Sequence, residues 1–176
     1  MLKKQKSSYG GELLKTRKGR SSGRPLDTKN TMHLVLRSSK AVGKWSLKFG
    51  QNPLKIREII KFFSSKYGIK IISLAIVGNH IHLQIKLSNR FTYPPFIRAI
   101  TSAIAMAVTG ASRWNKLKKE AKDKFWDYRP FSRVLQSYRA FLNLRDYIEI
   151  NKLEGFGYNK NQARFLLAWD RTENSS

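Results

Sequence analysis

The chain has 176 residues, of which 41% are hydrophobic and 12% aromatic, enough for one globular domain with its own core rather than a disordered chain. Its 35 lysines and arginines against 11 acidic residues give a formal charge of +24, which predicts a polyanionic partner: nucleic acid first, with an anionic membrane surface as the rival. The absence of cysteine excludes disulfides and thiolate metal sites, so any metal must use histidine, carboxylate or amide ligands.

Residues 1–30 are rich in Lys, Arg, Gly and Ser without apolar periodicity, which predicts a flexible basic N-terminal arm. Such an arm is either a solvated tail or a segment that contacts phosphates. It lacks the apolar stretch of a secretory signal, and the most hydrophobic helical segment, residues 99–111, is too short to span a bilayer. We therefore expect a cytoplasmic, nucleoid-associated protein of bacterial type that binds no membrane.

Residues 31–38 are predicted to form the first strand, and residues 44–49 alternate well enough to be its hairpin partner. A helix is predicted over residues 53–68, where apolar residues recur at helical spacing between an early proline and a final glycine. Residues 70–77 are a β-branched apolar run that ends at Gly78 and Asn79. Because a Gly-Asn pair is typical of short hairpin turns, this strand should pair antiparallel with the next one.

A second helix fits residues 94–114, strand character returns over residues 125–137, and a long helix covers residues 138–155. The folded domain is then residues 31–155, and residues 156–176 form a C-terminal tail. Hairpins dominate this order of elements. It predicts an α+β fold, a ferredoxin-like antiparallel sheet with helices packed on one face.

His80 and His82 lie in the strand that follows the Gly-Asn turn. Because side chains alternate along a strand, both imidazoles share one face with Gln84, while Ile81 and Leu83 share the other. The polar face indicates that the histidines are not core filler, although a histidine in a strand is more often structural. Two imidazoles at this spacing suit a divalent metal, with Gln84 either a hydrogen-bond partner of a ligand or a solvated amide.

Tyr147 and Asn151 are four residues apart in the last predicted helix and therefore lie on one helical face. Leu144 and Ile148 belong to the adjoining apolar stripe, which should pack on the sheet. That packing leaves Tyr147 and Asn151 at the boundary between helix and sheet, within reach of the histidines. The alternative is an amphipathic tyrosine whose hydroxyl only meets water.

Together these motifs resemble a known family. The strand Gly-Asn-His-Ile-His-Leu (78–83), the aromatic segment 125–134 and the helical motif Tyr-Ile-x-x-Asn (147–151) are similar to those of single-tyrosine (Y1) HUH transposases of the IS200/IS605 type. Within that type they resemble the REP-associated tyrosine transposases. The resemblance covers residues 31–155 and implies a catalytic domain with the HUH endonuclease fold, with the arm and the tail outside it.

The resemblance also implies an activity, metal-dependent cleavage of single-stranded DNA through a 5′-phosphotyrosine intermediate, followed by strand transfer and transposition. It implies Tyr147 as the nucleophile and one Mg²⁺ or Mn²⁺ ion held by His80, His82 and Asn151. Mixed nitrogen and oxygen ligands suit Mn²⁺ at least as well as Mg²⁺. The implied partner is single-stranded or hairpin DNA, and a homodimer is among the implied assemblies because the family includes dimers.

Basic and aromatic side chains could follow the phosphates and stack on unpaired bases, although aromatic residues at strand starts are more often core. The candidates are Lys116, Lys118, Lys119, Arg129, Arg133 and Trp126. The alternative function is a non-catalytic, domesticated DNA-binding protein of the same fold that recognises hairpin or repeat DNA. An RNA phosphoesterase of the 2H type also uses paired histidines, but it needs two His-x-Thr/Ser motifs that this sequence lacks.

Overall fold

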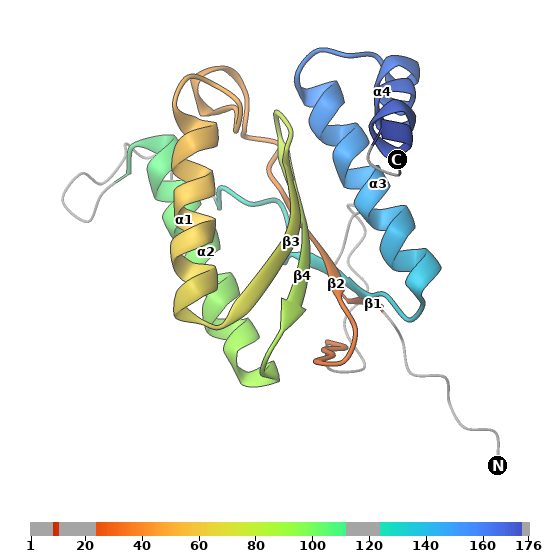
Figure 1. The fold of residues 1–176 in the computed structure, drawn as a ribbon. Helices are drawn as coiled ribbons and strands as arrows, with labels where there is room; N and C mark the ends of the chain where they lie inside the picture. The colour runs from red at the N-terminus through yellow and green to blue at the C-terminus, as the bar shows by residue number, and fades with distance from the viewer. Residues whose placement is uncertain (1–8, 11–23, 112–123, 174–176) are drawn as a thin grey trace.

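A computed structural model describes residues 9–10, 24–111 and 124–173, which form an antiparallel sheet with helices around it (Figure 1). The strands are β1 (Tyr9–Gly10), β2 (Met32–Arg37), β3 (Ile69–Ile76), β4 (His80–Leu87) and β5 (Phe131–Val134). The α-helices are α1 (Asn52–Lys66), α2 (Tyr93–Thr109), α3 (Tyr138–Gly155) and α4 (Lys160–Glu173). Short 3₁₀ helices span Gly43–Trp45 and Arg90–Thr92.

The strand order β1-β5-β2-β4-β3 results from two interleaved connections, and every pairing is antiparallel. The chain passes from β2 through α1 to β3 and leaves a gap that β4 fills. It passes from β4 through α2 to β5 and leaves a gap that β2 fills. These are the split βαβ units of ferredoxin-like folds, so the predicted α+β class is confirmed.

Helices cover both faces of the sheet (Figure 1). The main core lies between the sheet and the helices α1 and α2, where Leu83 and Phe96 are fully buried. A smaller buried cluster joins α3 to the sheet and consists of Ala75, Leu135, Leu144 and Ile148. The expected packing on one face thus holds for α1 and α2, whereas α3 covers the opposite face because it has an apolar stripe of its own.

The β3–β4 hairpin forms as the Gly-Asn pair predicts, with Ile76 opposite Ile81 and the Val77 N–H donating to the carbonyl of His80 at 2.9 Å. Leu83 and Ile85 are fully buried. The alternation of side chains along β4 turns the apolar set toward α1 and α2. It therefore turns the polar set, which contains the histidines, toward α3.

The prediction of a strand over residues 44–49 is wrong. The segment begins with the 3₁₀ helix Gly43–Trp45, and Gly43 and Gly50 both have positive φ angles, which bend the chain and suit glycine. Leu47 is fully buried, and its N–H donates to the carbonyl of Gly78 at 2.8 Å. The apparent alternation therefore reflects one buried residue that closes the end of the β3–β4 hairpin.

The strand predicted over residues 125–137 is confined to β5, because the preceding residues have other partners. The Trp126 indole N–H donates to the carbonyl of Thr101 in α2 at 2.8 Å. The Asp127 carboxylate accepts hydrogen bonds from the N–H and the hydroxyl of Ser39 at 2.7 and 2.8 Å. Pro130, which has no N–H to donate, directly precedes β5.

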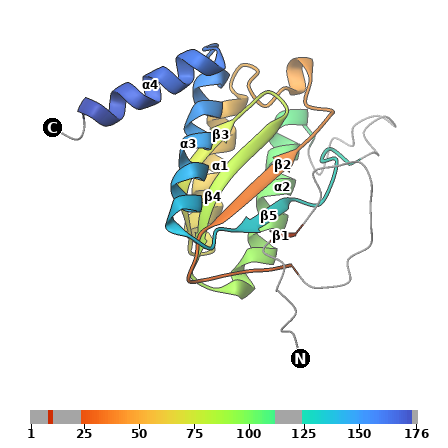
Figure 2. The same cartoon turned by 90° about the vertical axis from the view of Figure 1, so that its right-hand side faces the viewer.

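Both ends of the chain contribute described structure. β1 pairs with β5 at the edge of the sheet, and Arg24 donates to the hydroxyl of Ser132 at 2.6 Å. In the C-terminal segment, α4 packs on α3 through the buried Ala163 and then extends away from the sheet (Figure 2). Across the described ranges, no helix combines the length and apolar character needed to cross a membrane.

Candidate active site

The candidate site lies beside α3, which packs mainly on β3 and also contacts β4, and whose Tyr147 reaches across to the histidines of β4 and the adjacent β2. His80 and His82 project from β4 on the face that α3 covers, and His82 is only 5% exposed. β2 adds a third histidine on the same face, because His33 lies opposite Gln84 in the antiparallel register. All three histidines of the chain therefore gather in one place.

His33 was not among the predicted site residues. Alternation along β2 separates it from the apolar Leu34, but a residue's neighbour across a sheet depends on the pairing register. The sequence carried one usable signal. His33, like His80 and His82, lies in a strand whose opposite face is apolar, so it belongs to the polar face of that strand.

The aromatic rings of the site are in mutual contact. The ring centroids of His80 and His82 are 4.7 Å apart, and those of His33 and His82 are 5.3 Å apart in a stacked arrangement. Tyr147 on α3 meets them edge-on, at 5.2 Å from the ring of His82 and 6.4 Å from that of His33. The structure thus brings the predicted tyrosine and both predicted histidines together.

The hydrogen bonds leave one nitrogen of each metal-ligand candidate on β4 available. His80 Nδ1 lies 2.7 Å from Asn79 Oδ1 and must donate to it, which leaves the lone pair on Nε2. His82 Nδ1 lies 3.1 Å from His33 Nε2, while His82 Nε2 is buried without a hydrogen-bond partner. Such an orphaned nitrogen fits a metal ligand, because buried polar atoms are otherwise paired.

The histidines are neutral at physiological pH. Burial lowers the pKa of His33 to about 4, with a further contribution from the positive charge of Arg133. Burial lowers the pKa of His82 to about 3, helped by the neighbouring His80 and His33. Burial and then Arg37 lower the pKa of His80 as well. Because metals bind the neutral form of imidazole, these shifts favour metal binding at neutral pH.

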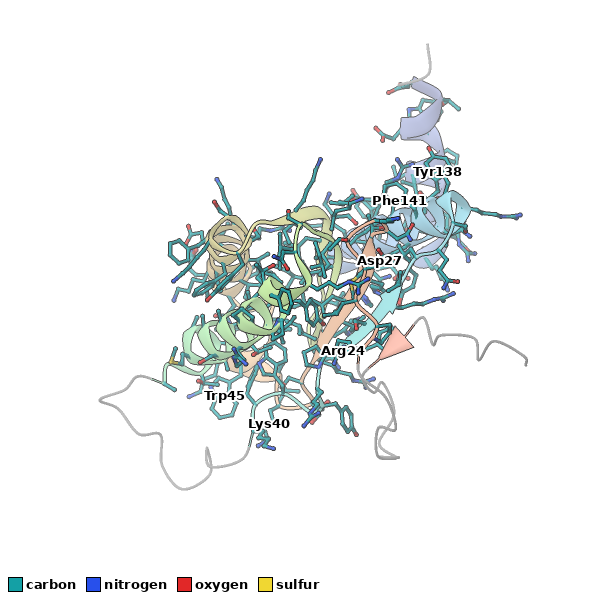
Figure 3. All side chains as sticks on the ribbon, turned by 90° about the horizontal axis from the view of Figure 1, so that it is seen from below. Arg24, Asp27, Lys40, Trp45, Tyr138 and Phe141 are labelled. Atoms are coloured by element: carbon teal, nitrogen blue, oxygen red, sulfur yellow. The ribbon has the colours of Figure 1, made fainter. Side chains whose placement is uncertain are left out.

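Three features stabilise α3, the helix that carries Tyr147, and one of them fixes it on the sheet. Its first turn is capped by the Ser137 hydroxyl, which accepts from the Ala140 N–H at 3.1 Å. Leu144 and Ile148 are buried against the sheet on the face next to Tyr147. In Figure 3, Tyr138 and Phe141 lie together at the beginning of this helix, with their rings stacked at 6.0 Å.

Gln84 joins α3 to the sheet. Its side chain is fully buried, its Oε1 accepts from the Ser73 hydroxyl at 3.1 Å, and its Nε2 donates to the carbonyl of Phe141 at 3.4 Å. The amide is therefore neither solvated nor bonded to a histidine, which corrects both roles considered from the sequence. It anchors the helix six residues before Tyr147.

Asn151 lies one helical turn after Tyr147, as predicted, and its Nδ2 donates to the carbonyl of Tyr147 at 2.7 Å. The amide nitrogen is thereby used, so Oδ1 is the atom that can ligate a metal. Throughout the described part of the chain, no three or more His, Asp or Glu side chains are arranged to hold a metal ion. A site built on His80 and His82 therefore needs a neutral oxygen such as that of Asn151.

Two arginines border the histidines. Arg37 lies opposite His80 in the β2–β4 register, and its side chain is 53% exposed, with the Asp127 carboxylate 4.0 Å away. Arg133 lies opposite His33 in the β2–β5 register and is exposed. The neutral imidazoles are thus flanked by positive charge on both sides, an arrangement that suits a phosphate group.

The other candidate DNA contacts are placed differently. Trp126 is partly buried against the main core, and its indole N–H is hydrogen-bonded to α2, so base stacking by its ring stays a prediction. Arg129 is exposed in the segment before β5. Lys116, Lys118 and Lys119 lie outside the described residues.

The family described as "Transposase IS200 like" matches residues 28–151, a range that contains every residue of the histidine and tyrosine motifs. The chain belongs to the IS200-like transposase family. This confirms the resemblance seen in the sequence. Among curated proteins, none matches this chain.

Two solved structures are similar to this IS200-like transposase, and the first of them supports the fold. A REP-associated tyrosine transposase bound to a REP hairpin is similar with a TM-score of 0.58 and 14% identity, over 77% of this chain and 74% of the other. A protein from Deinococcus radiodurans, described as a candidate transposase, matches with a TM-score of 0.45 and 18% identity, over 77% of this chain and 98% of the other. At 14% identity the first similarity supports the fold alone.

Proposed function

We propose that this IS200-like transposase cleaves and rejoins single-stranded DNA, with Tyr147 as the nucleophile. The observation that carries the proposal is the contact of the Tyr147 ring with His82, whose buried Nε2 lacks a hydrogen-bond partner. Tyr147 is 47% exposed, so this residue is open to a strand that enters from solvent. A tyrosine that only completed the core would be buried.

His80 Nε2, His82 Nε2 and Asn151 Oδ1 are the proposed ligands of one Mg²⁺ or Mn²⁺ ion. When bound, this ion supplies Lewis-acid polarisation of the scissile phosphate, which a phenol needs in order to react because it is a weak nucleophile. Asn151 keeps its amide oriented by donating to the Tyr147 carbonyl. This bond links the position of the third ligand to the backbone that carries the nucleophile.

The proposed reaction conserves the number of phosphoester bonds. The Tyr147 oxygen forms a bond to phosphorus while the bond from phosphorus to the 3′ oxygen breaks. The phenol loses a proton and the departing 3′ oxygen gains one. The products are a 5′-phosphotyrosine and a free 3′-hydroxyl, and attack by a 3′-hydroxyl in the reverse direction rejoins strands without an external energy source.

The proposed substrate is single-stranded DNA beside a hairpin, in the bacterial nucleoid. The formal charge of +24 favours a polyanion, and Arg37 and Arg133 place positive charge beside the imidazoles. The similar REP-associated transposase is bound to a REP hairpin, which makes hairpin DNA the first substrate to test. A homodimer remains part of the proposal, with Tyr147 in place beside the histidines of its own chain.

The decisive experiment uses hairpin oligonucleotides with randomised single-stranded flanks, labelled at the 3′ end and incubated with the protein and Mn²⁺. The fragment on the 3′ side of the cut should remain attached to the protein on a denaturing gel. Binding without any attached label would contradict the proposal. It would favour the alternative, a non-catalytic DNA-binding protein of the same fold.

A further inference from the structure

His33 has no role in the proposed chemistry, yet it contacts His82, a buried histidine of the site. Its Nε2 lies 3.1 Å from His82 Nδ1, and the two rings are stacked with an angle of 21° between their planes. The pair comes from adjacent strands whose register is set by the sheet, so the contact belongs to the rigid centre of the fold. The only other hydrogen-bonding atom of the His82 ring is the buried Nε2.

We propose that His33 is a positioning residue, which accepts a hydrogen bond from His82 Nδ1–H and so keeps the lone pair of His82 on Nε2, the proposed metal ligand. This inference rests on the proposed function. It adds a residue outside the set of ligands and nucleophile, and it concerns which nitrogen of His82 carries the proton.

The choice of proton position follows from burial. A neutral imidazole carries one proton, so His82 either donates through Nδ1 or accepts through Nδ1 and carries the proton on Nε2. In the second case a buried N–H would have no acceptor, which is unfavourable because the donor has given up its hydrogen bond to water without gaining another. The first case leaves only a lone pair without a partner, which is the state that a metal ligand requires.

His80 shows the same arrangement with a different partner. Its Nδ1 donates to Asn79 Oδ1 at 2.7 Å, which fixes the proton position and leaves Nε2 for a metal. Each candidate ligand on β4 thus has its Nδ1 held by a neighbouring acceptor. Hydrogen bonding of the non-ligating nitrogen is the usual way in which proteins orient a metal-bound histidine.

The geometry argues against His33 as a third ligand of the same ion. Its Nε2 is used by His82, and its ring is held by edge-on contacts with Phe131 at 6.1 Å and Tyr147 at 6.4 Å. These contacts fix the ring plane in which the hydrogen bond to His82 is made. His33 is therefore placed to orient His82 and not to replace it.

The test compares His33→Gln, which can place a carboxamide oxygen near the position of Nε2, with His33→Phe, which keeps a stacking ring but has no acceptor. Mn²⁺ binding to the full chain is measured by isothermal titration calorimetry without DNA. We expect His33→Phe to weaken Mn²⁺ binding roughly 10–100-fold and His33→Gln to restore most of it. Phe131→Leu is the matched control, because it alters packing around His33 but leaves the hydrogen bond.

Nitrogen-15 chemical shifts of the metal-free protein provide a second readout that does not depend on how well a variant folds. The wild-type protein should show His82 protonated at Nδ1. Protonation at Nε2 would overturn the inference, as would equal Mn²⁺ affinity in wild type and His33→Phe, or a His33→Gln variant as weak as His33→Phe. Failure of the wild type to bind Mn²⁺ would instead overturn the proposed function, on which the inference rests.

Discussion

Each imidazole of the site is held by a specific neighbour. Asn79 accepts from His80, and His33 is bonded to His82, so the rings are oriented before any ligand binds. Burial keeps both His33 and His82 neutral, and the positive charge of Arg133 lowers the pKa of His33 further. At the residue scale, the site therefore combines neutral donor atoms with positive charge at its margins. This combination suits the oxygens of a phosphodiester.

Replacing Tyr147 by Phe should reduce the yield of the covalent protein–DNA adduct by at least about a thousandfold, because the proposed nucleophilic oxygen is removed. DNA affinity should change little, since the ring and its contacts with His82 and His33 remain. Adduct yield on a denaturing gel and binding by fluorescence anisotropy measure the two effects. An adduct that persists in this variant would move the nucleophile to Tyr138 or Tyr158, both of which are exposed.

Replacing His80 by Ala should reduce Mn²⁺ affinity by at least about tenfold and reduce cleavage with it, because one proposed ligand is lost. The fold should persist, since His80 is only partly buried and lies at the first position of β4. Calorimetric titration with Mn²⁺ is the measurement, and unchanged affinity would remove His80 from the site. Ser64→Ala is a suitable control, because Ser64 lies in α1 and bonds only within that helix.

The low pKa values of His33 and His82 predict a loss of stability in acid. Both groups have a pKa near 6.5 when unfolded and of about 4 and about 3 when folded, so the unfolded chain binds more protons below about pH 6.5. Above that pH both histidines are neutral in the folded and the unfolded chain, so the free energy of unfolding has its full value with respect to these two groups. It should fall by on the order of 1–2 kcal/mol per histidine at about pH 5.

Urea unfolding at a series of pH values measures this dependence, and His33→Gln provides the comparison. The difference between the two stability curves isolates the contribution of His33 from that of the carboxylates. The variant should lose less stability than the wild type as the pH falls. Parallel curves would show that His33 does not titrate as its burial indicates.

At the scale of elements, α3 is the part that completes the site. It carries both Tyr147 and Asn151, and it reaches the sheet through buried apolar residues and the Gln84 anchor. The other two helices that pack on the sheet lie on its far face (Figure 1). The position of Tyr147, the proposed nucleophile, relative to the imidazoles therefore depends on how α3 docks on the sheet.

Replacing Gln84 by Leu tests this dependence. The change removes the bond to the Phe141 carbonyl and leaves the Ser73 hydroxyl without its acceptor, which should cost about 1–3 kcal/mol of unfolding free energy. Adduct formation should fall by more than the loss of folded protein, because Tyr147 is less well positioned. Urea unfolding and adduct yield per folded molecule are the measurements. Ser64→Ala again serves as a control, and normal adduct yield in Gln84→Leu would separate the anchor from function.

At the scale of the whole molecule, the residues that stabilise the fold differ from the charged residues that favour a polyanionic partner. The ferredoxin-like sheet and its helices are stabilised by an apolar core, whereas the formal charge of +24 is distributed outside that core and favours a polyanionic partner. Exposed arginines border the site, and further lysines lie in segments beyond the described residues. Affinity for DNA should therefore come largely from phosphate contacts.

DNA binding should consequently weaken steeply with salt. If the protein contacts about six to ten phosphates, its affinity falls roughly 10³–10⁵-fold between about 50 and 200 mM salt. Fluorescence anisotropy with a hairpin oligonucleotide at several salt concentrations gives the slope. Arg133→Gln should reduce the slope of log affinity against log salt concentration by about one, because one phosphate contact is lost. A slope near zero would contradict binding through phosphates.

Much of the fold was predictable because its signals are local. The helices over 53–68 and 138–155, and the hairpin at Gly78 and Asn79, follow from apolar periodicity and turn chemistry within a few residues. The strand predicted over 44–49 failed because a single buried Leu47 imitated alternation. Residues 125–130 do not form a strand because Trp126 and Asp127 are hydrogen-bonded to residues that are distant in the sequence.

For the candidate site, the sequence by itself determined that His80 and His82 share one face of a strand and that Tyr147 and Asn151 share one face of a helix, since both follow from local periodicity. Only the tertiary structure decided that α3 covers the face opposite α1 and α2, and that His33 lies against His82. Pairing register and helix docking depend on contacts between residues distant in the chain. No local pattern records those contacts.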